Sequence, residues 1–261
     1  MRIVTWNINS VRLRADLIER IAQWLHPDVI CLQETKSPDE FFPRDAFARS
    51  GYVHLALAGQ KAYNGVAIAS RLPLKAVRKS DFVGRSDCRH IQATVEGVEI
   101  HNFYVPAGGD IPDPDENVKF AHKLAFLDEM AQWVRLAART KRPLALVGDL
   151  NVAPLPSDVW SHKQLLNVVS HTPIEVEKLG AVQAAGDWVD AVRHFVPPEE
   201  KLYSWWSYRA NDWEASDRGR RLDHIWVTPK LAPSLSEAVI LREARGWELA
   251  SDHVPVMVEI R

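Results

Sequence analysis

The chain has 261 residues, of which 46% are hydrophobic and 25% are charged, as in an ordinary globular protein with a substantial core. Its 32 basic and 34 acidic residues give a net charge of −2, which excludes a protein held on nucleic acid or on an anionic membrane by bulk positive charge. Cys31 and Cys88 are too few for a disulfide scaffold and have no zinc-site spacing, so we expect two buried thiols and a cytoplasmic location. The chain begins without the apolar stretch of a signal peptide and has no run of about 18 apolar residues, so we expect no membrane segment.

The first part of the chain alternates apolar strands with helical periodicity. Residues 2–6 predict a strand, and helical spacing over residues 13–25 predicts a helix that ends at Pro27. The β-branched segment 28–33 is the next strand, and residues 65–70 form another after a polar stretch. The chain therefore opens as strand, helix and strand.

The middle and end of the chain predict a hairpin, one long helix and several further strands. The hairpin joins residues 91–95 to 98–105, and the long helix runs from Asn117 to about Arg139. Shorter helices are expected at 162–169 and 187–195. The remaining strands are expected at 144–148, 222–227, 238–241 and 254–260.

No linker, repeat or low-complexity stretch divides the chain, so we expect a single domain over residues 1–261. Interspersed strands and helices predict an α/β (α+β) fold. Because hairpin-like pairs interrupt the βαβα order, a two-sheet sandwich with helices outside is favoured over a doubly wound parallel sheet.

Polar side chains follow several of the apolar strands, at the ends where they can converge. They are Asn7, Asn9, Glu34, Asp149, Asn151, Asp223, Asp252 and His253. Oxygen ligands without thiolates suit Mg²⁺ or Mn²⁺ and argue against zinc. A histidine beside an acid can perform acid–base work near neutral pH. Together these groups can neutralise the charge of a phosphodiester, activate a water molecule that attacks it and stabilise the leaving oxygen. Any one of them alone is more often a turn or cap residue.

Six motifs in register carry a family resemblance over residues 6–256: TWNINS, LQETK, YNGVAI, GDLN, RLDHI and SDHVPV. They resemble the endonuclease/exonuclease/phosphatase superfamily. The stretch YSWWSYR, followed by RGRRLDHI, resembles its exodeoxyribonuclease III branch of bacterial abasic-site endonucleases more than its lipid or inositol phosphatases. The resemblance implies a four-layer α/β/β/α sandwich of two mixed sheets, with the site at their open edge.

The resemblance also implies roles for individual residues. The metal ligands it implies are Asn7, Glu34, Asp149, Asn151, Asp252 and His253, with Glu34 as the main ligand and Mg²⁺ or Mn²⁺ as the ion. The catalytic residues it implies are Tyr104, Asp149, Asn151, Asp223 and His253. Whether Asp149, His253 or a second metal acts as the base stays open. His90, His101, His122 and His224 have no such support and are taken as ordinary core or surface histidines.

DNA contact is expected to be local. The candidate DNA-binding residues are Asn9, Asn64, Trp205, Trp206, Arg209, Arg218, Arg220 and Arg221. The aromatic residues among them could instead be core. A second basic run is a weaker candidate, because charge runs are usually solvated faces: Lys75, Arg78, Lys79, Arg85 and Arg89.

Two positions depart from the family pattern. Ala107 stands where relatives often carry an amide side chain, and Arg220 stands where relatives commonly carry an apolar residue that lines the abasic pocket. These departures leave the metal chemistry untouched and affect the substrate preference.

The sequence therefore predicts a metal-dependent DNA phosphodiesterase of base excision repair. Its partner would be double-stranded DNA with abasic sites or blocked 3′ ends, bound by a monomer. One alternative is the same metal chemistry on RNA or a phosphoinositide. A non-catalytic DNA-binding module is the other, and the presence of Glu34, Asp149 and His253 argues against it.

Overall fold

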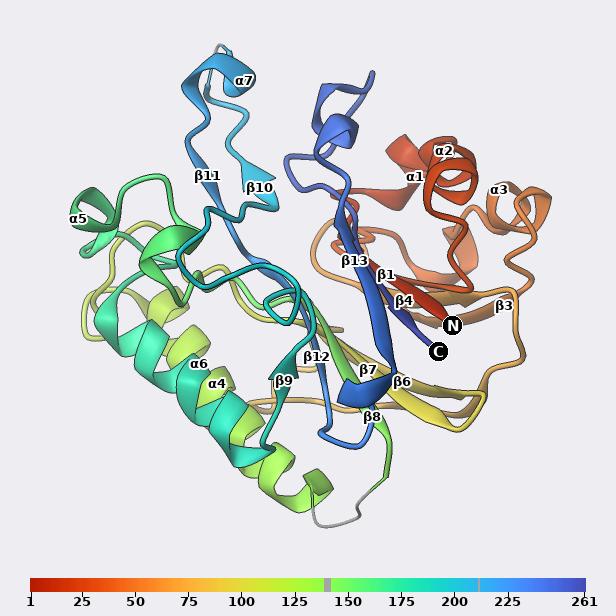
Figure 1. The fold of residues 1–261 in the computed structure, drawn as a ribbon, viewed down its shortest axis with the longest axis horizontal. Coiled ribbons are helices and arrows are strands. Elements are labelled where there is room, and N and C mark those ends of the chain that lie inside the picture. The colour runs from red at the N-terminus through yellow and green to blue at the C-terminus, as the bar shows by residue number, and fades with distance from the viewer. Residues whose placement is uncertain (139–141, 211) are drawn as a thin grey trace.

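Two six-stranded mixed sheets face each other in the computed structural model, which describes residues 1–138, 142–210 and 212–261 (Figure 1). The first sheet has the order β13-β14-β1-β2-β4-β3 and the second has the order β5-β6-β7-β8-β12-β9. The strands of the first sheet are β1 (Arg2–Asn7), β2 (Val29–Gln33), β3 (His54–Ala58), β4 (Val66–Ser70), β13 (Leu235–Ile240) and β14 (Val256–Ile260). Those of the second are β5 (Lys75–Lys79), β6 (His90–Val95), β7 (Val98–Tyr104), β8 (Leu144–Asp149), β9 (Val189–Asp190) and β12 (Asp223–Val227).

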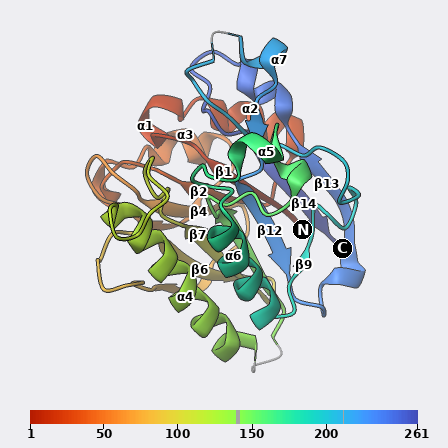
Figure 2. The same cartoon turned by 90° about the vertical axis from the view of Figure 1, so that its left-hand side faces the viewer.

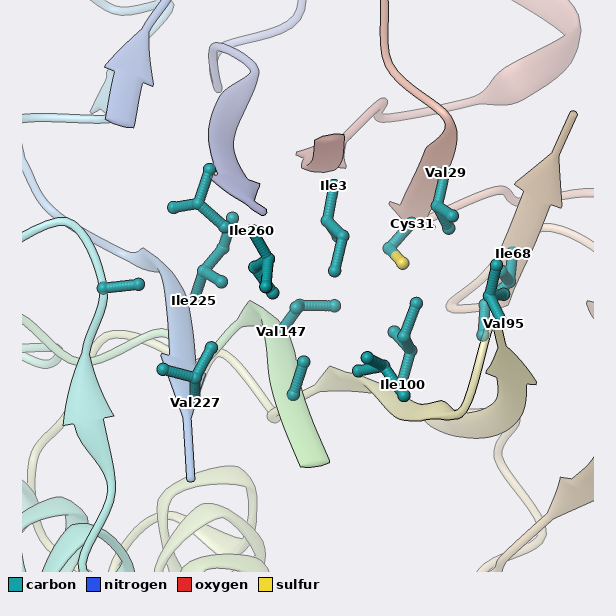
Figure 3. Close-up of a cluster of buried hydrophobic side chains, with 14 of the residues drawn as sticks. Ile3, Val29, Cys31, Ile68, Val95, Ile100, Val147, Ile225, Val227 and Ile260 are labelled. Carbon is teal, nitrogen blue, oxygen red and sulfur yellow. The ribbon is translucent and has the colours of Figure 1, made fainter. Parts of the chain in front are cut away.

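A dry core fills the space between the two sheets. Ile3 and Cys31 from the first sheet meet Ile100, Val147 and Ile225 from the second, all fully buried (Figure 3). Alternate residues of the same strands point to the outer faces, so that both faces of each central strand are apolar. The hydrophobic runs of the sequence therefore become sheet centres.

Helices cover the outer face of each sheet and complete four layers (Figures 1 and 2). The helices of the described ranges are α1 (Val11–Arg14), α2 (Leu17–Leu25), α3 (Arg44–Arg49), α4 (Val118–Ala138), α5 (His162–Leu165), α6 (Pro173–Ala185) and α7 (Trp213–Ser216), of which α5 and α7 lie beside the sheets rather than on their faces. Short 3₁₀ turns lie at Asp39–Phe41, Pro156–Asp158, Ala232–Ser234 and Arg242–Gly246. Helix α2 packs Ile18 and Ile21 on the first sheet, and α4 packs Phe126 and Met130 on the second. The expected α/β/β/α sandwich is confirmed.

A small hairpin, β10 (Trp205–Trp206) with β11 (Gly219–Arg220), projects with α7 beyond the sheets (Figure 1). Trp205 pairs with Arg220 in its register, and Trp205 also forms an isolated bridge with His253. The hairpin therefore connects the aromatic segment around Trp205 to the sheet edge at His253.

Most expected elements are present, but the segment 187–195 is not a helix. It forms the edge strand β9, which pairs with β12, and then turns in which the Asp190 carboxylate accepts the N–H groups of Val192 and Arg193. The helix in this region is α6, which begins at a Thr172 capping box with Glu175 as its third residue.

Other boundaries also differ from expectation. The first helix is divided into α1 and α2, the 162–169 helix is only the four-residue α5, and strands β3 and β5 were not predicted. The end of the long helix at Arg139 lies outside the described residues. Cys31 is buried as expected, whereas Cys88 is only partly buried. Within the described ranges, no helix is long and apolar enough to cross a membrane.

Candidate active site

Strand ends from both sheets meet at one edge of the sandwich. Asn7 ends β1 beside the end of the parallel β2, which Glu34 follows. In the second sheet, Tyr104 and Asp149 end the parallel pair β7 and β8, and Asp223 at the start of antiparallel β12 lies opposite Asp149. Because parallel strands carry their carboxyl ends to the same edge, residues far apart in the chain become neighbours.

The backbone at this edge is unusually constrained. Gly148 (φ 143°) precedes Asp149 where β8 passes so close to β7 that an added Cβ would lie 1.9 Å from the Phe103 carbonyl oxygen. Glu34 and Asn151 adopt left-handed backbone angles, with φ of 51° and 54°. Such conformations cost of order 1–3 kcal/mol each outside glycine and persist where the surrounding structure fixes them. The framework thus holds the polar side chains in fixed directions.

Glu34 is surrounded by donors. Tyr104 donates its hydroxyl to Glu34 Oε1 at 2.6 Å, Asn7 Nδ2 donates to the same oxygen at 3.0 Å, and Lys36 Nζ lies 2.8 Å from Oε2. Burial alone would raise the pKa of Glu34, but the Lys36 ammonium and these hydrogen bonds lower it below its usual value. Burial next to Glu34 raises the pKa of Tyr104. Glu34 is therefore held ionised and Tyr104 held neutral.

Asp149 lies on the other side of Asn7. The Asn7 amide nitrogen also donates to Asp149 Oδ2 at 2.9 Å, so one side chain spaces the two carboxylates. Asn151 donates to Asp149 through its backbone N–H at 3.0 Å and its side-chain nitrogen at 3.1 Å. Complete burial raises the pKa of Asp149, and the neighbouring His253 acts in the opposite direction. The carboxylate is thus a buried group whose protonation depends on its neighbours, as in many catalytic acids and bases.

His253 and Asp223 form a buried pair beside Asp149. His253 Nδ1 lies 2.8 Å from Asp223 Oδ2, and its Nε2 points toward Asp149 Oδ2 at 3.7 Å. Burial alone would lower the pKa of His253, but the carboxylates of Asp223 and Asp149 raise it. Ser204 donates to the same Asp223 oxygen at 2.7 Å and fixes its position. The imidazole is therefore oriented by Asp223, with its Nε2 facing Asp149.

The donor set fits a hard divalent cation. In the described part of the chain, Asp149, Asp223 and His253 place their ligand atoms within 4.8 Å of one another. The second oxygen of Asp223, Oδ1, is buried and has no hydrogen-bond partner, a costly arrangement that a cation would relieve. Carboxylate oxygens without thiolates are the ligands of Mg²⁺ and Mn²⁺. Glu34 adds another carboxylate on the far side of Asn7.

Asp252 and Asn9 lie at the rim of this group and contact each other. Asn9 Nδ2 donates to Asp252 Oδ1 at 3.1 Å, and Trp205 Nε1 donates to Oδ2 at 3.0 Å. Lys36 Nζ donates to Asn9 Oδ1 at 2.6 Å. Both carboxylate oxygens of Asp252 thus accept side-chain hydrogen bonds, and the bond from Trp205 holds this indole at the site.

A cavity of about 810 Å³ opens over these residues. Its floor includes Glu34, Asp149, Asn151 and His253, and the β10–β11 hairpin forms a wall. The wall residues that were expected to bind DNA are Trp205, Arg209, Arg218 and Arg220. Ala107, the departure from the family pattern, also lines the cavity and offers it no amide side chain. The cavity is large enough for a nucleotide-sized group.

Three expected DNA-binding residues are placed elsewhere. Arg221 is only 1% exposed, lies within 2.6 Å of Asp190 and contacts Asp158, so it is a structural ion pair. Trp206 is 2% exposed and packs edge-on against Tyr203 and Trp213. Asn64 donates to the Asp87 carbonyl oxygen in a left-handed turn outside the cavity. Burial keeps Arg221 and Trp206 away from the cavity surface. The left-handed turn holds Asn64 outside the cavity.

Several structurally important residues were missed by the sequence analysis. Lys36 and Ser204 contact Glu34 and Asp223 directly. Lys123 is fully buried, pairs with Glu175 and donates to the Asn151 carbonyl oxygen at 2.7 Å. Lys36 is the last residue of the LQETK motif and could have been found there, whereas nothing in the sequence links Lys123 to Asn151.

Comparisons with known proteins agree with this geometry. A sequence profile of the Endonuclease/Exonuclease/phosphatase family matches residues 4–253. Exodeoxyribonuclease III of Haemophilus influenzae is 30% identical over the full length of both chains. The chain belongs to the exonuclease III/AP endonuclease family of that superfamily. The family resemblance expected from the motifs is thus confirmed, and the protein is a phosphodiester hydrolase of this family.

Solved structures in the same family carry two different descriptions. An AP endonuclease from Archaeoglobus fulgidus is 31% identical with a TM-score of 0.92, and the match covers 100% of this chain and 99% of that one. A 3′ phosphatase from Neisseria, NExo, solved with a product DNA hairpin, is 32% identical with a TM-score of 0.91 and the same coverage. Family membership therefore leaves the preferred DNA lesion to be argued from the site.

Proposed function

We propose that this protein is a divalent-metal-dependent DNA repair phosphodiesterase that incises duplex DNA 5′ to abasic sites and leaves a 3′-hydroxyl. We further propose 3′-to-5′ exonuclease activity and removal of 3′-blocking groups at the same site. The observation that carries the proposal is the hydrogen-bonded cluster of Glu34, Asn7, Asp149 and the His253–Asp223 pair at the base of one cavity that Trp205 also lines. The family membership and a DNA-bound relative support it.

The site residues divide the work of hydrolysis. Asp149, Asp223 and Glu34 would hold a Mg²⁺ or Mn²⁺ ion, which would neutralise phosphate charge. Asp149, with Asn151 beside it, orients the attacking water and accepts its proton. His253, fixed by Asp223, donates a hydrogen bond to the phosphate oxygen where negative charge develops. Tyr104, held neutral by burial beside Glu34, donates a second hydrogen bond on the other side.

We also propose that residues 1–261 act as one domain, as a monomer in the cytoplasm, on double-stranded DNA. Strands β1 and β14, from the two ends of the chain, pair in the same sheet, which supports a single folding unit. The exposed Arg209 and Arg218 at the cavity rim supply local phosphate contacts that the net charge of −2 does not provide.

The direct test incubates the purified protein with an abasic-site duplex and Mg²⁺. We expect incision 5′ to the abasic site, and no incision when EDTA is present. Parallel reactions with single-stranded RNA and a phosphorylated inositol head group test the alternative substrates. Intact DNA in both the Mg²⁺ and the Mn²⁺ reaction would refute the proposal, and preferential turnover of either alternative substrate would replace it.

A further inference from the structure

One arginine of the cavity wall lacks the partner that buried cations usually have. Arg220 is partly buried, since its guanidinium carbon lies 5.2 Å from the centre of the Trp205 ring, on the wall of the cavity. Its Nη1 donates to the Val169 carbonyl oxygen at 3.0 Å and to Ser170 Oγ at 2.8 Å. Its Nε is buried and has no hydrogen-bond partner among the residues that the structure describes. Throughout the described ranges, no carboxylate lies within 4.0 Å of this guanidinium.

The neighbouring residue shows the usual arrangement. Arg221, the next residue, contacts both Asp158 and Asp190. A desolvated cation is costly unless an anion compensates it. Burial accordingly lowers the pKa of Arg220, although Glu175 opposes this at longer range. An uncompensated guanidinium on a cavity wall is therefore suited to an anion that arrives with the substrate.

The arginine is also held in place before any ligand arrives. Ser170, which accepts its hydrogen bond, is fixed through its own N–H by Glu175, and Glu175 is paired with buried Lys123. Trp205, on which the guanidinium lies, is fastened by Asp252 at 3.0 Å. Because little side-chain freedom remains to be lost, an oxyanion bound here gains from preorganisation.

The position relative to the reacting group defines the ligand. Trp205 pairs with Arg220 in the β10–β11 hairpin and forms an isolated bridge with His253. Its backbone therefore lies between those of Arg220 and His253. Two cross-strand steps correspond to about 10 Å between the backbones of Arg220 and His253. A phosphate contacted by His253 and a short acidic remnant attached to it can occupy that span. An uncharged sugar would leave the guanidinium without its anion.

We propose that Arg220 is a specificity-determining residue that binds an oxyanion on the 3′-terminal remnant of damaged DNA. That oxyanion is a carboxylate beyond the scissile phosphate or the doubly charged terminal phosphate itself. The enzyme then favours anionic blocked 3′ ends over the uncharged sugar of an abasic site. The inference rests on the proposed DNA phosphodiesterase function and names its preferred substrate class.

The test compares substrates that differ in charge and share their shape. Nicked duplexes carry a 3′-phosphoglycolate, its uncharged 3′-phosphoglycolamide analogue or a 3′-phosphate, and a fourth duplex carries a tetrahydrofuran abasic analogue. For the wild type, we expect kcat/KM to be about tenfold or more higher for the carboxylate than for the amide, as a charge-assisted hydrogen bond allows. In Arg220→Met, which keeps an apolar contact with Trp205, the ratio should fall toward one.

Two further variants control the test. Arg218→Met removes an exposed arginine that lies over Trp160 at 4.7 Å on the same rim, and it should weaken all four substrates to a similar extent. Arg220→Lys keeps the charge and should retain part of the preference, which separates charge from packing. Thermal unfolding of each variant identifies any that fails to fold, in which case Arg220→Gln replaces it.

Each outcome has one meaning. A loss confined to the phosphoglycolate assigns the carboxylate, and a loss confined to the 3′-phosphate assigns the terminal phosphate. An equal effect of Arg220→Met on charged and uncharged substrates, or no effect, overturns the inference while the proposed function stands. If the wild type cleaves none of the four duplexes, the proposed function itself fails.

Discussion

The floor and the wall of the cavity are built in different ways. The floor consists of sheet-edge residues, among them Asp149 and His253, which are 1% and 5% exposed and fixed by hydrogen bonds from Asn7 and with Asp223. The wall is the two-residue pairing of β10 and β11, whose Trp205 and Arg220 are only partly buried. The floor residues are built into the sheet edge, so their side chains have little room to vary. The wall residues can be substituted without disturbing the sheets. This difference suggests that the chemistry resides in the floor and the choice of lesion in the wall.

The largest expected effect comes from a change in the floor. Asp149→Asn replaces the acceptor of the Asn7 and Asn151 side-chain amides with a group that cannot take a proton. We expect kcat to fall at least about 10³-fold on every DNA substrate, within the range of general acid–base contributions. Steady-state rates on abasic and 3′-blocked duplexes measure this. A fall on one substrate class only would contradict the division between floor and wall.

Adjacent arginines provide the second test, because one belongs to the framework and the other to the wall. Arg221→Met leaves Asp190 and Asp158 without their shared cation, so we expect the free energy of unfolding to decrease by about 3–5 kcal/mol. Arg220→Met leaves no carboxylate behind and should cost about 1 kcal/mol or less. Urea denaturation of both variants makes the comparison. Equal losses would show that Arg220 is structural as well.

Sequence patterns predicted that the floor residues would lie at the ends of apolar strands. The motifs that contain Glu34, Asp149 and His253 each follow an apolar strand, and the structure places these residues at one sheet edge. The parallel pairing of β1 with β2 and of β7 with β8 is what joins them, and the strand patterns alone do not specify that pairing.

Sequence patterns were less successful for the wall and for the irregular region before it. Arg220 and Arg221 were grouped as DNA-binding, although successive residues of an extended segment point to opposite sides and only one of them can face the cavity. The α6 helix carries a visible signal, Thr172-Pro173 followed by Glu175, which the periodicity argument overlooked. Lys123 could not be connected to Asn151 without the three-dimensional packing of α4.

A smaller effect concerns the free energy of unfolding at acidic pH, which depends on the buried His224. Burial, and then Arg221, lower the pKa of His224 to about 3, and its Nε2 donates to the Val152 carbonyl oxygen at 2.9 Å. Above pH 6.5 neither the folded nor the unfolded state protonates this residue. Below pH 6.5 only the unfolded state gains the proton, so the stability falls by about 1.4 kcal/mol per pH unit until pH approaches 3.

His224→Gln tests that prediction because its amide can still donate to the Val152 carbonyl oxygen and cannot titrate. Between pH 6.5 and pH 5, the wild type should lose about 2 kcal/mol more of its free energy of unfolding than the variant. Urea denaturation at several pH values provides both curves. Parallel curves would mean that His224 is protonated in the folded protein, contrary to its burial. His90 and His101, whose pKa values burial also lowers, remain in both proteins and cancel in the comparison.

The smallest expected effect concerns Lys75 and Arg78 of the second basic run, which do not line the cavity. Arg89 of the same run lies over the Tyr104 ring at 4.8 Å and is left unchanged. Lys75 lies opposite Thr94, at the end of β5 remote from the site, and Lys75 and Arg78 are both exposed. We expect Lys75→Ser/Arg78→Ser to change kcat/KM less than twofold and to leave the salt dependence of DNA binding unchanged. Each lost phosphate contact should reduce the slope of log K against log salt by about 0.9, and Arg218→Met is the positive control. A reduced slope in the double variant would extend the DNA-binding surface to β5, far beyond the cavity wall.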